Sequence, residues 1–210
     1  MKNRSIALLT LWIGLSLNAC QMTNLYDARP LKKGEKSLTV GTDSQVVELS
    51  DPQTSFTNKL IPHLAIYPSL EYSWGTRYNT NYSISLSTSD GLSFGAKIGL
   101  IGKKTPKFGL AIYPKVGAFA GQGELIYFSR IPLLISFYKG EKFSFTYAPA
   151  LMLTSQKIFT NSNAAFFNSI NFQTGNKHRF AMSYGGGVFN KNVVSQLSMG
   201  YIWRFGEIKP

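Results

Sequence analysis

Cysteine and histidine are nearly absent from this sequence, which has one Cys and two His in 210 residues. A lone thiol, that of Cys20, excludes a disulfide within the chain. The histidines, His63 and His178, are far apart, and the ten acidic residues are scattered, so no spacing typical of a metal site occurs. The glycine-rich stretches also lack the spacing of a phosphate-binding loop. The sequence therefore predicts no metal site and no cofactor.

A hydrophobic run long enough to cross a membrane as a helix is also lacking. The apolar run from Ile6 to Leu17 is too short for that, but with Lys2 and Arg4 before it the run is typical of a secretory signal. We therefore predict an exported protein from which residues 1–19 are removed.

Acidic residues are scarce, with 10 Asp and Glu against 22 Lys and Arg, and charged residues make up only 15% of the chain. Loss of Lys2 and Arg4 with the signal would leave 20 basic against 10 acidic residues. Such a charge attracts polyanions, among them nucleic acid, anionic lipid head groups and lipopolysaccharide phosphates. Recognisable nucleic-acid modules are missing, and an exported protein meets the other two. The expected partners are therefore outer-membrane lipid and lipopolysaccharide, and not nucleic acid.

What the sequence does contain is a series of short segments with alternating apolar and polar residues. Turn signals such as Lys139-Gly140-Glu141 and Thr174-Gly175-Asn176 separate them and indicate antiparallel hairpins. The ten predicted strands are 36–43, 60–74, 78–88, 91–102, 107–119, 124–138, 142–155, 164–174, 177–188 and 192–205. Prolines inside them, at 68, 114, 132 and 149, predict bulges or breaks.

Each predicted strand has one face of large apolar residues and one of small, polar or basic residues. In the last strand Leu197, Met199 and Tyr201 alternate with Ser198 and Gly200. If the apolar faces pointed inward, ten such rows would have to fit one core, and the outer surface would carry few charges. If they point into lipid, they need no packing partners. The sequence thus predicts an all-β, antiparallel, up-and-down transmembrane β-barrel of about ten strands, or of eight if the first and eighth segments lie outside the wall.

Aromatic residues gather beside the turns that follow even-numbered strands, as in a girdle at a membrane interface. The predicted girdle consists of Trp74, Tyr78, Tyr82, Phe108, Tyr138, Phe143, Phe172, Phe180, Trp203 and Phe205.

The C-terminal stretch Ser198, Gly200, Trp203, Phe205 resembles the assembly signal of bacterial outer-membrane β-barrels, in which a polar residue and a glycine precede two aromatics two positions apart. It departs from that pattern because 206–210 follow the aromatic where such chains normally end. The resemblance implies an outer-membrane protein that the barrel assembly machinery recognises.

The run Leu17-Asn18-Ala19-Cys20 resembles the bacterial lipobox, whose cysteine is diacylated and becomes the new N-terminus, although Asn18 is less usual there. Gln21, in place of an Asp, then implies sorting to the outer membrane. The alternative is a plain signal peptide cleaved near Ala19. The predicted organisation is a signal peptide (1–19), a lipidated N-terminus and tether (20–35), a barrel (36–206) and a short tail (207–210).

With the apolar faces in lipid, several charged side chains face the lumen, and Glu124 lies at its rim. The predicted lumen residues are Glu71, Lys97, Lys107, Lys115, Arg130, Arg179 and Arg204. So many bases with so few acids require water or anions. One interpretation is a basic lumen that favours anionic solutes or an acidic lipid head group. The other is an ion-pair network centred on Glu71 that plugs a narrow barrel.

We therefore expect a lipid-anchored outer-membrane barrel with a structural or narrow, anion-leaning channel role, and no catalysis. One alternative is a soluble periplasmic-side barrel lipoprotein with its apolar faces around a lipid or another apolar ligand. The second is an outer-membrane acyl hydrolase. For that enzyme, His63 has no serine in a nucleophile context beside it, and His178 lies between Lys177 and Arg179, which do not orient a catalytic base. The sequence specifies neither a solute nor an oligomeric state.

Overall fold

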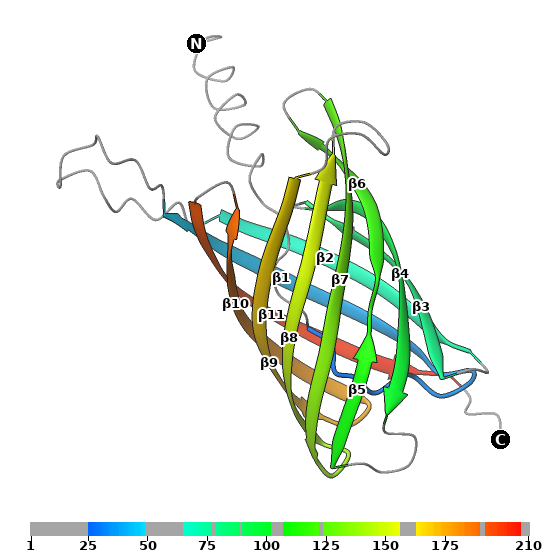
Figure 1. The fold of residues 1–210 in the computed structure, drawn as a ribbon. Coiled ribbons are helices and arrows are strands. Elements are labelled where there is room, and N and C mark those ends of the chain that lie inside the picture. Colours follow the sequence, from blue (N-terminus) through cyan, green and yellow to red (C-terminus); the bar gives the residue numbers. More distant parts are fainter. Residues whose placement is uncertain are drawn as a thin grey trace, which may run out of the picture.

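The computed structural model describes residues 25–48, 65–76, 79–88, 90–101, 107–121, 124–155, 163–189 and 192–206. They form a closed antiparallel β-barrel, preceded by a short N-terminal segment (Figure 1). The strands are β1 (Lys36–Glu48), β2 (Ala65–Gly75), β3 (Thr80–Ser87), β4 (Gly91–Ile101), β5 (Phe108–Ile112), β6 (Lys115–Gly121), β7 (Glu124–Lys139), β8 (Phe143–Ser155), β9 (Asn163–Gly175), β10 (His178–Phe189) and β11 (Asn192–Phe205).

Pairing of the first strand with the last closes the barrel. The register of β1 and β11 runs from Lys36 opposite Phe205 to Glu48 opposite Val193. Strands β5 and β6 share one position in the wall, because both pair with β4 and with β7. The wall therefore has ten positions, and the ten-strand prediction is confirmed. The eight-strand alternative is wrong, because the first and eighth segments form β1 and β9 of the wall.

Proline interrupts the wall where it removes a ladder donor. Tyr113 and Pro114 separate β5 from β6, and the pairing of β7 with β8 is interrupted between Pro132 and Ile135. By contrast, Pro68 pairs with Thr42 in an unbroken register, so no break occurs there.

The outer face of the barrel is apolar. Its exposed side chains include Leu70, Phe94, Met182, Met199 and Tyr201, as the alternation predicts. Several charged residues of the described strands instead face inward: Asp43, Glu71, Lys97, Lys115, Arg130, Arg179 and Arg204. The prediction of outward apolar faces is confirmed, and the alternative with those faces inward around a ligand is wrong. The physical reason is that a belt of exposed Leu, Ile and Phe is stable in lipid and costly in water.

None of the helices within the described ranges has the length and apolar character needed to cross a membrane.

Most of the predicted girdle lies on the outer face, with Trp74, Tyr82, Phe108, Phe143, Phe172, Phe180 and Trp203 exposed and Phe205 partly so. Tyr78 lies outside the described residues. Tyr138 is a correction, because it points into the lumen and its ring lies 4.2 Å from the guanidinium carbon of Arg29. Its neighbour Phe137 takes the outward position on β7.

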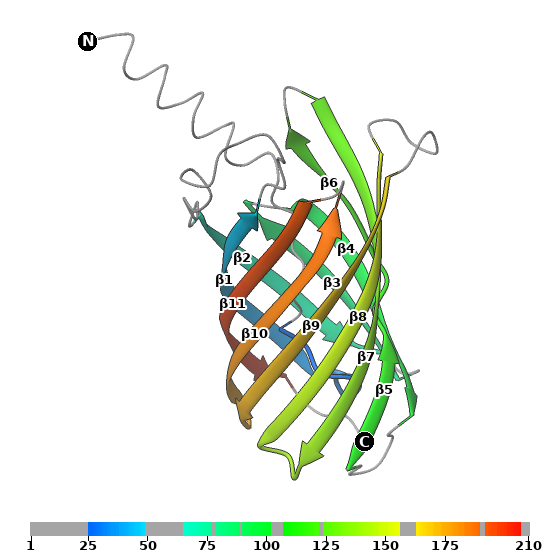
Figure 2. The same cartoon turned by 60° about the vertical axis from the view of Figure 1, so that its left-hand side comes forward.

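Residues 25–35, part of the predicted tether, pack against the barrel. Leu25, Asp27, Ala28 and Leu31 are buried, and the segment lies inside the wall near the end of the barrel where β1 begins (Figure 2). We call residues 25–31 the lumen segment. A turn at Lys32 to Glu35, with Gly34 at φ 81°, then reverses the chain into β1. Cys20 and the rest of the predicted tether lie outside the described residues.

Strand β1 is longer than the predicted segment 36–43, because 44–48 also belong to it. Residues 49–64 and 156–162 lie outside the described residues.

The lipid-facing assignment predicts a depth-dependent cost for an outward charge. Met182→Arg places a charge near the middle of β10 and should lower the free energy of unfolding in lipid vesicles by about 2–4 kcal/mol. His178→Arg, at the end of the same strand, should cost less than about 1 kcal/mol. Denaturant titration of both variants measures the difference, and equal costs would contradict a lipid-facing β10.

Candidate functional site

The first charged centre of the lumen surrounds Glu71. Its Oε2 lies 2.6 Å from Nζ of Lys115, and its Oε1 accepts hydrogen bonds from the Tyr113 hydroxyl at 2.7 Å and from Ser73 Oγ at 3.0 Å. All four side chains are buried. The period of two places Glu71 and Ser73 on the inner face of β2, and because it continues across Pro114, Tyr113 and Lys115 both point inward as well. Both oxygens of this carboxylate therefore have partners on the wall.

The second centre surrounds Asp27 of the lumen segment. Arg179 Nη1 lies 3.0 Å from Oδ2, while Arg29 Nε and Arg204 Nη2 each lie 3.8 Å from a carboxylate oxygen. Asp27 is only 1% exposed. Three guanidinium groups thus converge on one acid, and their positive charge stabilises its ionised form against the cost of burial.

Lys97 binds the lumen segment differently. Its Nζ donates to the main-chain oxygens of Asp27, at 3.2 Å, and of Arg29, at 3.0 Å. It therefore holds the backbone of the segment and not its carboxylate.

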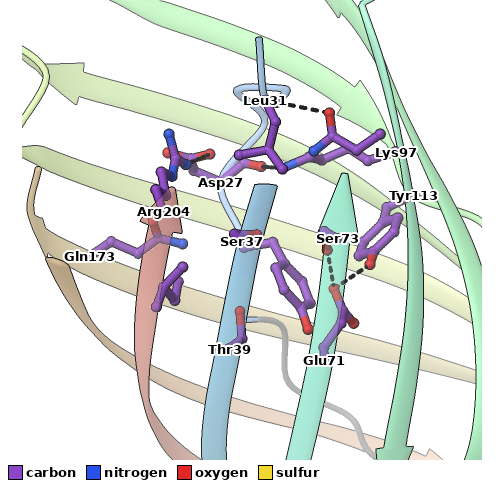
Figure 3. A pocket seen from close by; sticks show the side chains of 13 residues that line it. Asp27, Leu31, Ser37, Thr39, Glu71, Ser73, Lys97, Tyr113, Gln173 and Arg204 are labelled. Atoms are coloured by element: carbon purple, nitrogen blue, oxygen red, sulfur yellow. Dashed lines mark hydrogen bonds and ion pairs between the residues drawn. The ribbon is translucent and has the colours of Figure 1, made fainter. Parts of the chain in front are cut away.

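A small cavity of about 20 Å³ lies between the two centres. Asp27, Glu71, Lys97, Gln173 and Arg204 are among the residues that line it (Figure 3). This volume is enough for about one water molecule and far too small for an acyl chain.

Apolar side chains pack together in the lumen toward its other end, in a cluster of Phe119, Phe128, Met152, Ala165 and Phe167. Gly187 makes room for one of these rings, since a Cβ there would lie 2.1 Å from Phe167 Cδ1. The cluster narrows the lumen beyond the charged centres.

The structure places most of the predicted lumen residues on the inner face. Glu71, Lys97, Lys115, Arg130 and Arg179 are buried there, and Arg204 is partly buried. It brings Glu71 to Lys115, and Arg179 and Arg204 to the same carboxylate. Arg130 on β7 lies opposite Lys115 in the register.

Lys107 is a correction among the predicted lumen residues. It precedes β5 and is exposed, because it belongs to the turn and not to the alternating part of the strand. Glu124 is the first residue of β7.

Three residues of the lumen segment, Tyr26, Asp27 and Arg29, were missed by sequence reasoning. Tyr26 packs edge-on against Tyr113, with ring centroids 5.1 Å apart, and its ring lies 5.0 Å from Lys115 Nζ. The sequence did contain an indication: the predicted lumen residues included several bases and only one acid, Glu71, and such an imbalance favours a further acid nearby. Two acids, Asp27 and Glu35, lie shortly before the first strand, and Glu35 Oε1 also lies 3.9 Å from Arg204 Nη1.

The residues of the C-terminal motif divide between the two faces. Ser198 and Gly200 are buried on the inner face, and the Ser198 hydroxyl donates to Asp43. Trp203 and Phe205 lie on the outer face with ring centroids 4.9 Å apart. Their role in assembly stays a prediction.

His178 lies among aromatic residues on the outer face. Its Nδ1 is hydrogen-bonded to the Tyr201 hydroxyl, and its ring stacks on that of Trp203. These are contacts of an interfacial residue and not those of a catalytic base. His63 lies outside the described residues. Within the described ranges no group of three or more His, Cys, Asp or Glu side chains could hold a metal ion.

Comparisons with known proteins yield no matching family model and no matching curated sequence. Among solved structures, the chain is similar to Ail, the attachment invasion locus protein of Yersinia pestis, at 14% identity and a TM-score of 0.39 over 82% of this chain and 99% of that chain. It is also similar to an outer-membrane channel from Pseudomonas putida F1, at 8% identity and a TM-score of 0.49 over 85% and 98%. A third similar structure is the outer-membrane protein OprG of Pseudomonas aeruginosa. It has 12% sequence identity and a TM-score of 0.36 over 86% of this chain and 100% of that chain. These likenesses concern barrel architecture alone.

The Glu71 centre predicts an asymmetric response to mutation. Glu71→Gln leaves the Lys115 ammonium buried without its carboxylate and should lower the free energy of unfolding by about 3–5 kcal/mol. The double variant Glu71→Gln, Lys115→Met removes both charges and should recover a large part of that loss. Denaturant titration in one lipid measures both, and equal losses in the two variants would show that the ion pair does not account for the cost.

Proposed function

We propose that the protein is a non-catalytic outer-membrane barrel, lipid-anchored through Cys20, in which the lumen segment closes a narrow, anion-leaning pore. The observation that carries this proposal is the position of Asp27. Asp27 precedes the first strand of the wall. Inside the lumen, however, its carboxylate lies 3.0 Å from Arg179 Nη1 and 3.8 Å from Arg204 Nη2, and so balances the charge of these two wall arginines.

The charges of the inner face favour anions when the segment leaves. The described wall carries five inward bases, Lys97, Lys115, Arg130, Arg179 and Arg204, against the two inward acids Asp43 and Glu71. Glu71 is already paired with Lys115. Withdrawal of Asp27 therefore leaves an excess of positive charge around the lumen, as in pores that select anions.

The closed barrel with its apolar belt supports a membrane location, and the resemblances at both ends of the sequence support the outer membrane. Exposed lysines also surround the end of the barrel where β1 begins and β11 ends: Lys33, Lys36, Lys107, Lys139, Lys142 and Lys177. In the proposed location they contact anionic lipid head groups. The exposed Trp203 and Phe205 are the side chains that the barrel assembly machinery would meet.

Lipidation is tested directly by the mass of the mature N-terminal peptide. We expect cleavage before Cys20 and a diacylglycerol on its sulfur. Cys20→Ser should abolish the added mass and release the N-terminus from its anchor. An unmodified Cys20, or cleavage elsewhere in the wild type, would refute the anchor and leave the barrel proposal intact.

Anion conductance is tested in planar bilayers with the full chain. The wild type should be closed most of the time, whereas Asp27→Asn weakens a charge-assisted contact and should raise the open time roughly tenfold or more. In a KCl gradient, the sign of the reversal potential of the open state should show that chloride is more permeant than potassium.

Glu141→Gln is the matched control, because it removes one acid from an exposed turn at the same end of the barrel and keeps the main-chain oxygen that accepts from Arg179 Nη2. It should leave the open time unchanged. If Asp27→Asn stays closed, the barrel has the structural role alone, and a cation-selective open state would contradict a basic pore.

A further inference from the structure

The wall binds the lumen segment chiefly through its main chain. Five wall side chains from four strands make these contacts. Three of them donate to main-chain oxygens of the segment: Gln173 to Leu25 O (2.6 Å), Asn171 to Tyr26 O (3.0 Å), and Lys97 to Asp27 O and Arg29 O. The other two accept from main-chain N–H groups: Ser136 Oγ from Ala28 N (2.8 Å) and Asn81 Oδ1 from Leu31 N (2.8 Å). The exception among the seven residues is Pro30, which has no N–H to donate. The donors and acceptors of the inner face thus match the main-chain groups of a short peptide that bends at the position of Ala28.

Small wall residues make room for the side chains of the segment. A Cβ at Gly41 or Gly200 would lie 2.9 or 2.6 Å from Leu25 Cδ1, so the two glycines form a notch for this leucine. Ala28 packs in a cluster with small and apolar residues, among them Ala111 and Ala148. The space at these two positions fits a side chain the size of leucine and one the size of alanine, so it selects for size and not for charge.

Specificity comes from the carboxylate clamp. Arg179 and Arg204 lie on the adjacent strands β10 and β11, and both face Asp27. Arg204 Nε is buried without a hydrogen-bond partner, so the clamp retains an unused donor. An acidic side chain at this position of a bound peptide gains charge-assisted hydrogen bonds that a neutral side chain does not.

We propose that the lumen is a binding site for a short peptide that bends next to a carboxylate near its centre, a site that residues 25–31, with their bend at Ala28, occupy within the chain. This inference rests on the proposed function in one respect, the withdrawal of the segment. A free phosphate or a lipid phosphate fits less well, because Ser136 and Asn81 accept hydrogen bonds from peptide N–H groups and the other contacts are to peptide carbonyl oxygens.

Thiol labelling at Ser136 tests the proposal in the full chain. Ser136 is buried beneath the segment, so a cysteine there, in a Cys20→Ser background, reacts with a water-soluble reagent only when the segment leaves. Asp27→Asn should speed labelling roughly tenfold or more. A control cysteine at the exposed Lys142 should react at one rate throughout.

A peptide of sequence Leu-Tyr-Asp-Ala-Arg-Pro-Leu, added to the Asp27→Asn chain, should restore slow labelling, whereas the same peptide with Asn at its third position should not. Millimolar peptide is needed, because the tethered segment competes at an effective concentration of about that order. Equal protection by the two peptides, or none, would overturn the proposal. Inorganic phosphate that protects as well as the Asp peptide would reduce the site to an anion site.

Two further measurements keep the outcome decisive. If Asp27→Asn does not fold, Leu25→Ser, which empties the notch at Gly41 and Gly200, replaces it with the same expected result. Conductance of the same variant without peptide reports separately on the proposed pore. A conducting variant without peptide protection refutes the peptide site alone, and protection without conductance refutes the pore alone.

Discussion

Burial of basic side chains in a lumen with little room for water is the constraint on which the rest of the structure depends. Lys97, Lys115 and Arg179 are each almost fully enclosed, and a buried charge without a partner is among the most destabilising features that a fold can contain. The structure meets this constraint at two places, once within the wall at Glu71 and once by bringing Asp27 into the lumen. The N-terminal segment is therefore part of the electrostatic core of the barrel.

The two charged centres differ in whether their contacts can break while the wall stays closed. Glu71 and Lys115 belong to strands β2 and β6, which cannot separate without opening the wall. Asp27 belongs to a segment that no strand ladder holds, and its contacts are side-chain hydrogen bonds and ion pairs. A segment bound in this way can leave while the wall persists, because local opening requires only the loss of its own contacts. In the function proposed above, this difference separates the wall, as a rigid scaffold, from the lumen segment, as a plug that can be displaced.

Glycine has a dual role in this arrangement. Gly200 belongs to the stretch that resembles an assembly signal, and it also forms half of the notch for Leu25. Gly187 similarly makes room for the ring of Phe167. Both positions bear on packing within the lumen, so a side chain at either would alter how the barrel is filled even if the strands still paired.

The sequence by itself determined the wall. Alternation with period two shows which residues of each strand face lipid, so the ten strands, the exposed Tyr201 and the inward Glu71, Lys97 and Arg179 follow from local pattern. Tyr138 was misplaced because its position was inferred from a turn and not from the alternation of β7. Only the tertiary structure decided the contents of the lumen. Asp27 meets Arg179 across 152 residues of sequence and Ala28 meets Ser136 across 108, in a segment with no period of its own. A stretch that reads as a polar tether acquires its conformation from partners on distant strands, and a local pattern carries no information about such partners.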